Sequence, residues 1–317
     1  MHSEAAECSG VAPKAKSKVR GWLIIWPLWF LFAAIARQSI IETLRLSIAK
    51  DQYSYILLAI CISLAIIIAE RQRIKSLAHA DFVAGIPALA VAALVLLFLT
   101  ASSVGLSSDV QRAVQMSVLV LSCVGGFVLC LGRLAFNCAL FPLLLLFGAV
   151  PLPDRMLTVI IDQLQQGSAL SAAALFWVAG VPVAREGTVL AIPGLTMLVA
   201  PECSSIRSTA LLFVTTLTLT HFLLRSRWHR VLVVALSVPL SIAKNGLRIF
   251  IIAMLGTRLD PAYLTGRLHR YGGIVLFALI VTAVLGLVFM LRARERKRQV
   301  FSLPSTRAAG DRPRILV

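Results

Sequence analysis

Long apolar runs restrict the fold of this chain more than any other feature of its sequence. A helix needs roughly 20 apolar residues to cross about 30 Å of hydrocarbon. Eight runs near this length, separated by charged or turn residues, cover 21–36, 53–69, 82–100, 113–132, 134–150, 205–224, 231–256 and 271–291. The mean hydropathy of +0.88 exceeds what a soluble domain needs for its core. We therefore expect an all-α integral membrane protein, a polytopic helical bundle of about eight transmembrane helices.

The net charge of +17 is distributed in a way that predicts topology. Most Lys and Arg lie between or beyond the apolar runs, where they set orientation and contact anionic lipid rather than nucleic acid. The basic residues before Trp22 favour a signal anchor with a cytoplasmic N-terminus. The segments then predicted to be cytoplasmic are the more basic ones, with Arg37, Arg45 and Lys50 as an outer exception. The chain divides into a cytoplasmic tail (1–20), a membrane domain (21–292) and a basic cytoplasmic tail predicted to be disordered (293–317).

The longest section outside the predicted spans, 151–201, is assigned to the extracytoplasmic side by this topology. Apolar residues recur at helical spacing from Leu157 to Leu164 and predict an amphipathic helix on the membrane surface. Turn residues then frame short β-branched runs between Gly180 and Gly194, which predicts a small hairpin. This small extracytoplasmic section leads directly to the most polar stretch near the later spans.

That stretch, 200–208, contains the one cysteine with neighbours that favour reactivity. Cys8 lies in the N-terminal tail, and the other four cysteines lie in apolar runs, where a thiol behaves as an inert hydrophobe. Cys203 precedes a helix whose dipole favours a thiolate, as does Arg207, whereas Glu202 opposes it. The six cysteines show neither a disulfide framework nor zinc-ligand spacing, so we predict no metal and no cofactor.

Two further polar elements lie at the depth of Cys203. Lys244-Asn245-Gly246-Leu247-Arg248 interrupts the seventh run, and His269 precedes the eighth. At 1.5 Å per residue, Cys203, Arg248 and His269 lie roughly 33, 27 and 35 Å above the basic residues at the opposite ends of their runs. Connected neighbouring spans tend to pack together, so these three residues are expected to converge at the outer surface.

The three residue types suit acyl transfer without a metal. A thiolate attacks a peptide carbonyl, a histidine exchanges the protons and an arginine stabilises the thiolate or the oxyanion. Taken singly, each residue is more often structural: a cysteine at a helix start, an arginine paired with a headgroup, an interfacial histidine. Their coincidence at one depth makes the catalytic hypothesis about as strong as the structural one, because ionisable groups in membranes tend to be functional.

These elements resemble the exosortase/archaeosortase family of multi-pass membrane cysteine proteases or transpeptidases, over about the last two-thirds of the chain. The matching motifs are Cys203-Ser204, Asn245 to Ile249 (Asn-x-x-Arg-Ile) and His269 to Gly273 (His-x-x-x-Gly). The resemblance implies that Cys203 is the nucleophile, Arg248 the transition-state stabiliser and His269 the acid/base. Ser204, Asn245, Arg207 and Gly273 would support them. Ser205 stands where many members have glycine.

The resemblance also implies a substrate class and a location. Family substrates are exported proteins with a C-terminal signal made of a short motif such as Pro-Glu-Pro, a transmembrane helix and a basic cluster. The expected location is the bacterial cytoplasmic (inner) membrane, with the active site facing the periplasm or exterior and a link to exopolysaccharide or biofilm production. Membrane lipids are expected partners, and nucleic acid is not.

Two hypotheses from other classes stay open at the level of the sequence. In a transporter, Arg248 and His269 would bind an anionic solute or relay protons, although no inverted repeat is evident and the midplane is nearly free of polar groups. A polysaccharide-assembly membrane protein would retain the fold without protease activity. A quinone-linked thiol oxidase is disfavoured because it requires paired outer cysteines.

Overall fold

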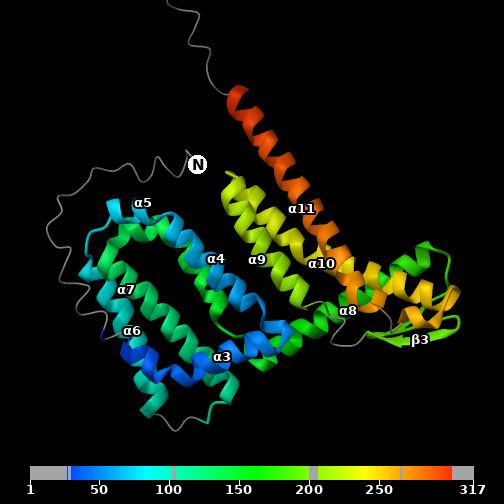
Figure 1. The fold of residues 1–317 in the computed structure, drawn as a ribbon, viewed down its shortest axis with the longest axis horizontal. Coiled ribbons are helices and arrows are strands. Elements are labelled where there is room, and N and C mark those ends of the chain that lie inside the picture. The colour runs from blue at the N-terminus through cyan, green and yellow to red at the C-terminus, as the bar shows by residue number, and fades with distance from the viewer. Residues whose placement is uncertain (1–26, 28–29, 102–104, 200–205, 265–266, 302–317) are drawn as a thin grey trace, which may run out of the picture.

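The computed structural model describes residues 27, 30–101, 105–199, 206–264 and 267–301, and these form two groups of helices joined by one long helix. Figure 1 shows the N-terminal group in blue to green and the C-terminal group in yellow to red, with helix α8 (Asp154–Val178) running from one to the other. The small β-sheet lies at the far end of α8, beside the C-terminal group.

The N-terminal group contains α3 (Arg37–Ala49), η1 (Asp51–Tyr53), α4 (Tyr55–Ala69), α5 (Arg71–Ser76), α6 (Phe82–Ala101), α7 (Ser108–Leu145) and η2 (Leu146–Ala149). The segment that the sequence analysis treated as an outer connection is the helix α3. It is fixed to α7 by an ion pair of 3.0 Å between Arg112 Nε and Glu42 Oε2, and by a hydrogen bond from Ser39 to Gln115.

Helix α7 is two helical legs that meet at Gly132. This glycine has φ 79° and ψ 174°, and a Cβ here would overlap the carbonyl oxygen and ring of His79. The N–H of Asp154 donates to the carboxylate of Asp109 at 2.9 Å, so the beginning of α7 and the chain just beyond its end lie together. A straight helix of this length would hold them about 55 Å apart. The chain therefore reverses at Gly132, which confirms the predicted boundary between 113–132 and 134–150.

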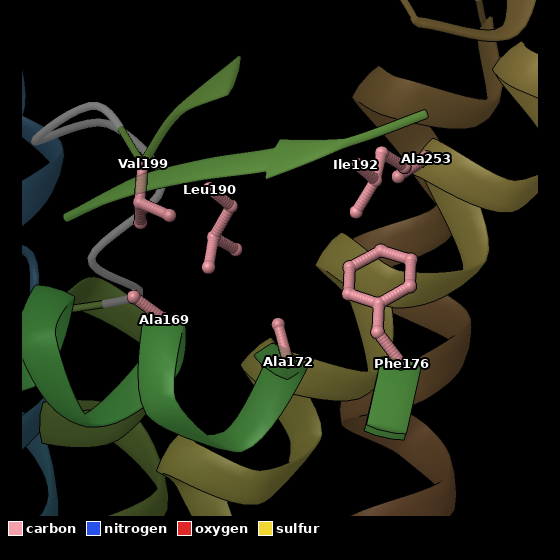
Figure 2. Packing of buried hydrophobic residues seen from close by; sticks show 7 residues of the cluster. All are labelled: Ala169, Ala172, Phe176, Leu190, Ile192, Val199 and Ala253. Atoms are coloured by element: carbon pink, nitrogen blue, oxygen red, sulfur yellow. The ribbon is translucent and has the colours of Figure 1, made fainter. Parts of the chain in front are cut away.

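The section before the Cys203 stretch forms a sheet packed on α8. Strands β1 (Ala184–Glu186), β2 (Val189–Ile192) and β3 (Leu195–Leu198) are antiparallel in the order β1-β2-β3, and Ala191 pairs with both Ala184 and Thr196. The structure therefore contains the predicted hairpin and a third strand paired with it. Figure 2 shows Leu190 and Ile192 above Ala172 and Phe176 of α8, with Ala253 closing the side. This core fixes the chain up to Val199, which is 2% exposed.

The C-terminal group contains α9 (Ile206–Leu223), α10 (Arg227–Arg258), η4 (Pro261–Leu264) and α11 (Arg267–Phe301). At the end predicted to be cytoplasmic, Glu295 of α11 accepts hydrogen bonds from the backbone N–H groups of Arg225 and Ser226 at 2.8 and 3.2 Å. The same carboxylate lies 2.5 Å from Nδ1 of His229. One partly buried carboxylate therefore joins the α9–α10 turn to α11.

The structure confirms helical membrane spans but does not confirm their predicted number. Four stretches of the described chain are long and apolar enough to cross a membrane: Ser108–Ala149, Ile206–Leu223, Arg227–Arg258 and Gly272–Lys297. Tyr55–Ala69 and Phe82–Phe98 are apolar but shorter, and most of the first predicted run lies outside the described residues. The protein is helical and membrane-spanning, while the predicted total of about eight spans is not confirmed.

Candidate active site

The beginning of α9 is fixed to α10 by two polar contacts. Lys244 Nζ donates to Ser208 Oγ at 2.6 Å, and one turn away the hydroxyls of Thr209 and Ser241 lie 2.7 Å apart. Lys244 is only 6% exposed, although a lysine inside an apolar helix is costly to bury. The hydrogen bond to Ser208 lowers that cost and sets the height of the first turn of α9 against α10.

The beginning of α11 lies against the next turn of α10. A Cβ on Gly273 would lie 3.8 Å from both Cζ and Nε of Arg248, so the guanidinium occupies the space beside this glycine. Four residues further along α11, the ring centroid of Phe277 lies 5.8 Å from Lys244 Nζ, within the range of a cation–π contact. Arg248 and Lys244 therefore both face α11.

Lys244 and Arg248 share one face of α10, because residues four apart in a helix project from adjacent turns. Ser208 of α9 contacts the first of these cations and Gly273 of α11 contacts the second. The first turn of α9 and the second turn of α11 thus converge on one cationic face of α10. No carboxylate in the described part of the chain forms an ion pair with Lys244. Two cations of like charge one turn apart favour an anion between the three helices.

Asn245 faces α8 and is fully buried. Its amide donates to Ser168 Oγ at 2.9 Å, and Ser168 in turn donates to the carbonyl of Leu164 at 2.6 Å. The next residue, Gly246, is so close to α8 that an added Cβ would overlap the side chain of Ser171. Asn245 and Gly246 therefore position α10 on α8.

The residues proposed from sequence differ in how far the structure describes them. Cys203 and Ser204 fall in 200–205, outside the described residues, and for His269 the backbone alone is described, in the first turn of α11. Arg207 is exposed in the first turn of α9. Arg248 and Gly273 are brought together, whereas Asn245 contacts Ser168 on the adjacent helix α8. The roles of all seven residues stay predictions.

The chain on both sides of 200–205 is held near this site. Val199 accepts a hydrogen bond from the Gln165 side chain at 2.8 Å and donates to the carbonyl of Thr188 at 3.0 Å. On the other side, Ile206 begins α9, two residues before the Ser208 contact with Lys244. The structure thus fixes both ends of the stretch that contains the candidate nucleophile.

Sequence analysis missed two residues of this site. The sequence motifs contain Lys244 as a cation in the seventh run and Ser208 as part of the polar stretch, but they do not indicate either as a site residue. Their signal was available, since a lysine within an apolar helix needs a polar neighbour. What the sequence did not supply is which of several hydroxyls provides it.

The site suits chemistry that develops negative charge. A guanidinium and an ammonium in a poorly solvated position stabilise an anion more strongly than they would in water. No cluster of three His, Cys, Asp or Glu residues able to hold a metal occurs within the described ranges.

The depth of the site follows from the length of α10. From Arg248 to Arg227 at the other end of α10 the helix rises roughly 32 Å, which is about one hydrocarbon thickness.

Comparison with known proteins identifies the family. The model of the transmembrane exosortase family matches residues 46–286, a region that contains all three candidate motifs. Neither the curated proteins nor the solved structures gave a match. Because the matched region covers well over half of the chain, this protein belongs to the transmembrane exosortase family.

Proposed function

We propose that this protein is a membrane-embedded cysteine peptidase or transpeptidase that acts at the outer face of the membrane. Membership of the exosortase family supports a protease or transpeptidase role in the membrane. The observation that supports the proposal is the convergence of the first turn of α9 and the second turn of α11 on the cationic face of α10. Cys203 lies five residues before Ser208, and His269 lies four residues before Gly273.

In the first half of the proposed reaction, His269 accepts the proton of the Cys203 thiol and the thiolate attacks the peptide carbonyl. The carbonyl π electrons move to oxygen, and the resulting oxyanion is stabilised by the Arg248 guanidinium. The intermediate then collapses, the C–N bond breaks and the departing amine takes the proton from His269. The products are a thioester on Cys203 and the released C-terminal fragment.

In the second half, a new nucleophile resolves the thioester. His269 removes a proton from water, an amine or a hydroxyl, and the nucleophile forms a bond to the acyl carbon. The C–S bond breaks, and the Cys203 sulfur recovers its proton from His269. Water gives hydrolysis, whereas an amine or a hydroxyl gives transpeptidation or an ester.

The proposed substrates are exported proteins with a C-terminal sorting signal, made of a short motif such as Pro-Glu-Pro, a transmembrane helix and a basic cluster. A cleavage point just outside the membrane suits a site about one hydrocarbon thickness above the cytoplasmic turn. The proposal places the protein in the bacterial inner membrane, with about eight spans and a link to exopolysaccharide export.

Processing of a tagged exported protein with such a signal tests this function. Cys203→Ala is expected to leave the precursor uncleaved, because the acyl-enzyme needs the thiol. Cys8→Ala is the matched control and is expected to process normally. Each variant must accumulate in the membrane at the wild-type level. Normal processing by Cys203→Ala would overturn the protease proposal and favour the transporter hypothesis.

A further inference from the structure

Val199 is the last described residue before the stretch that contains Cys203, and both of its backbone polar groups are paired. Its N–H donates to the carbonyl of Thr188 at 3.0 Å, and its carbonyl accepts a hydrogen bond from Nε2 of Gln165 at 2.8 Å. Its side chain is 2% exposed and belongs to the core between the sheet and α8, where Figure 2 shows it over Ala169. The point at which the chain leaves the sheet is therefore fixed to α8, four residues before the candidate nucleophile.

The hydrogen bond from Gln165 differs in kind from the other two contacts of Val199. The core contact holds the side chain and the bond to Thr188 continues the sheet, whereas Gln165 holds the carbonyl that leads into the next residue. Pro201, two residues further along, has no N–H with which to extend the ladder. A side chain of α8 therefore pairs with the backbone where the sheet ends.

The same section of α8 also holds the part of α10 that carries the Asn-x-x-Arg-Ile element. Ser168 accepts a hydrogen bond from the amide of Asn245 at 2.9 Å, and Ser171 lies against Gly246. From Gln165 to Ser171 the helix rises only about 9 Å, which is less than two turns. One short section of α8 thus contacts both the chain before the candidate nucleophile and the motif that contains the candidate oxyanion stabiliser.

We propose that Gln165 is a positioning residue for Cys203, a role that rests on the proposed function. Through the carbonyl of Val199 it sets the position of the thiol relative to Arg248, from the section of α8 that also positions α10. Gln165 acts through the backbone and takes no part in bond making. Because a misplacement of about 1 Å costs on the order of 100-fold in rate, loss of this hydrogen bond should lower kcat.

Kinetics of the purified full-length protein, with a substrate that carries a C-terminal sorting signal, test this role. Gln165→Met keeps the length of the side chain but removes the donor, so kcat is expected to fall about tenfold while KM changes less than about twofold. Gln165→Lys keeps an N–H donor at a partly exposed position and is expected to recover kcat to within about threefold of wild type. Both variants should unfold near the wild-type temperature, which separates positioning from folding.

Gln166 provides the matched control, because it has the same side chain at the next position of α8. It is exposed, and its amide donates to the carboxylate of Asp162 at 2.9 Å. Gln166→Met should therefore process like wild type. Equal losses in Gln165→Met and Gln166→Met would mean a general effect on α8 and would overturn the positioning role. Equal kcat values for Gln165→Met and Gln165→Lys would also overturn it, because the donor would then not matter.

Alkylation of Cys203 separates this role from the proposed reaction. In a protein whose other five cysteines are changed to alanine, the rate of reaction with iodoacetamide reports the thiolate character and access of Cys203 without any substrate. Gln165→Met is expected to lower this rate about threefold or more, because the thiol moves away from Arg248, and Gln166→Met to leave it unchanged.

The two measurements distinguish failure of the positioning role from failure of the proposed function. An unchanged alkylation rate in Gln165→Met overturns the positioning role, whatever the activity of Cys203→Ala. Normal processing by Cys203→Ala, together with slower alkylation in Gln165→Met, overturns the protease proposal and leaves the position of the thiol under the control of Gln165.

Discussion

Arg248 and Gly273 meet where α10 and α11 approach each other, and a methyl group on Gly273 would lie 3.8 Å from Cζ of Arg248. This contact joins two of the three sequence motifs, although they are separated by a turn and by η4. An alanine at position 273 would be in ordinary contact with the guanidinium, whereas a larger side chain would compete with it for space. The His-x-x-x-Gly element therefore places a small residue beside Arg248, on the helix that carries His269.

The size of the residue at position 273 is expected to control activity. Gly273→Ala adds a methyl group at ordinary contact distance and should keep processing within about threefold of wild type. Gly273→Leu should displace the guanidinium and reduce processing at least tenfold, since one oxyanion donor contributes about 100-fold or more. The assay is the processing rate of the tagged substrate at matched protein levels.

Gly286 provides the control on the same helix, because an added Cβ there meets nothing within 4 Å. Gly286→Leu should process like wild type. Equal losses in Gly273→Leu and Gly286→Leu would show that bulk on α11, and not the Arg248 contact, causes the defect.

Lys244 is expected to contribute to activity through its charge. Lys244→Met keeps the length of the side chain but removes a buried cation one turn from Arg248, so processing should fall about tenfold or more. Lys244→Arg should retain more activity than Lys244→Met because it keeps the charge. Ser208→Ala should have a smaller effect, since Lys244 keeps its contact with Phe277.

The matched control for Lys244 is Lys75→Met, which removes an exposed lysine at the predicted cytoplasmic end. Its processing rate should not change. Equal activity of Lys244→Met and wild type would remove Lys244 from the site.

Gly246 of α10 and Ser171 of α8 approach so closely that a larger residue at one position should be offset by a smaller residue at the other. Gly246→Ala should lower the free energy of unfolding by about 1–3 kcal/mol, because its methyl group overlaps Ser171. Ser171→Gly should restore part of this loss in the double variant, while the nearby N–H of Ala172 at 2.9 Å limits the recovery. Gly105→Ala, which meets no atom within 4 Å, is the control for thermal unfolding in detergent. Additive effects of the two changes would contradict the contact.

The sequence predicted those features that have a periodic or compositional signal. Apolar runs located α9, α10 and the beginning of α11 to within four residues, whereas α11 continues ten residues beyond the end of its run. The Gly132-Arg133 interruption correctly separated two legs. The helical spacing from Leu157 predicted α8, and turn residues from Gly180 predicted strands before the Cys203 stretch. In each case the local pattern and the tertiary structure agree.

Other features depend on contacts between distant residues and had no local signal. The third strand forms because Leu195–Leu198 pairs with Val189–Ile192, and the amphipathic α8 packs against α10 through Gly167 and Ile242. The role of Asn245 is of the same kind, since its partner Ser168 is 77 residues away. The resemblance gives Asn245 a supporting role beside Arg248, but the sequence does not indicate that its partner is Ser168 of α8.

The topology is testable by labelling single cysteines in an otherwise cysteine-free protein. Cysteines at Glu186 and Ala262, both exposed, should react with an impermeant maleimide in intact cells. Cysteines at Lys75 and Trp228, also exposed, should react only after permeabilisation. These positions follow the distribution of basic residues. Labelling of Trp228→Cys in intact cells would contradict the outer location of the site.

Detection of the acyl-enzyme tests the central proposal most directly. The purified protein is mixed with a substrate that carries a C-terminal sorting signal, quenched in acid and analysed by peptide mass spectrometry. The account predicts that the substrate segment before the cleaved bond is attached to the peptide containing Cys203, that neutral hydroxylamine removes it, and that Cys203→Ala forms no adduct. Cleavage by Cys203→Ala at the wild-type rate, or an adduct on a different residue, would contradict it.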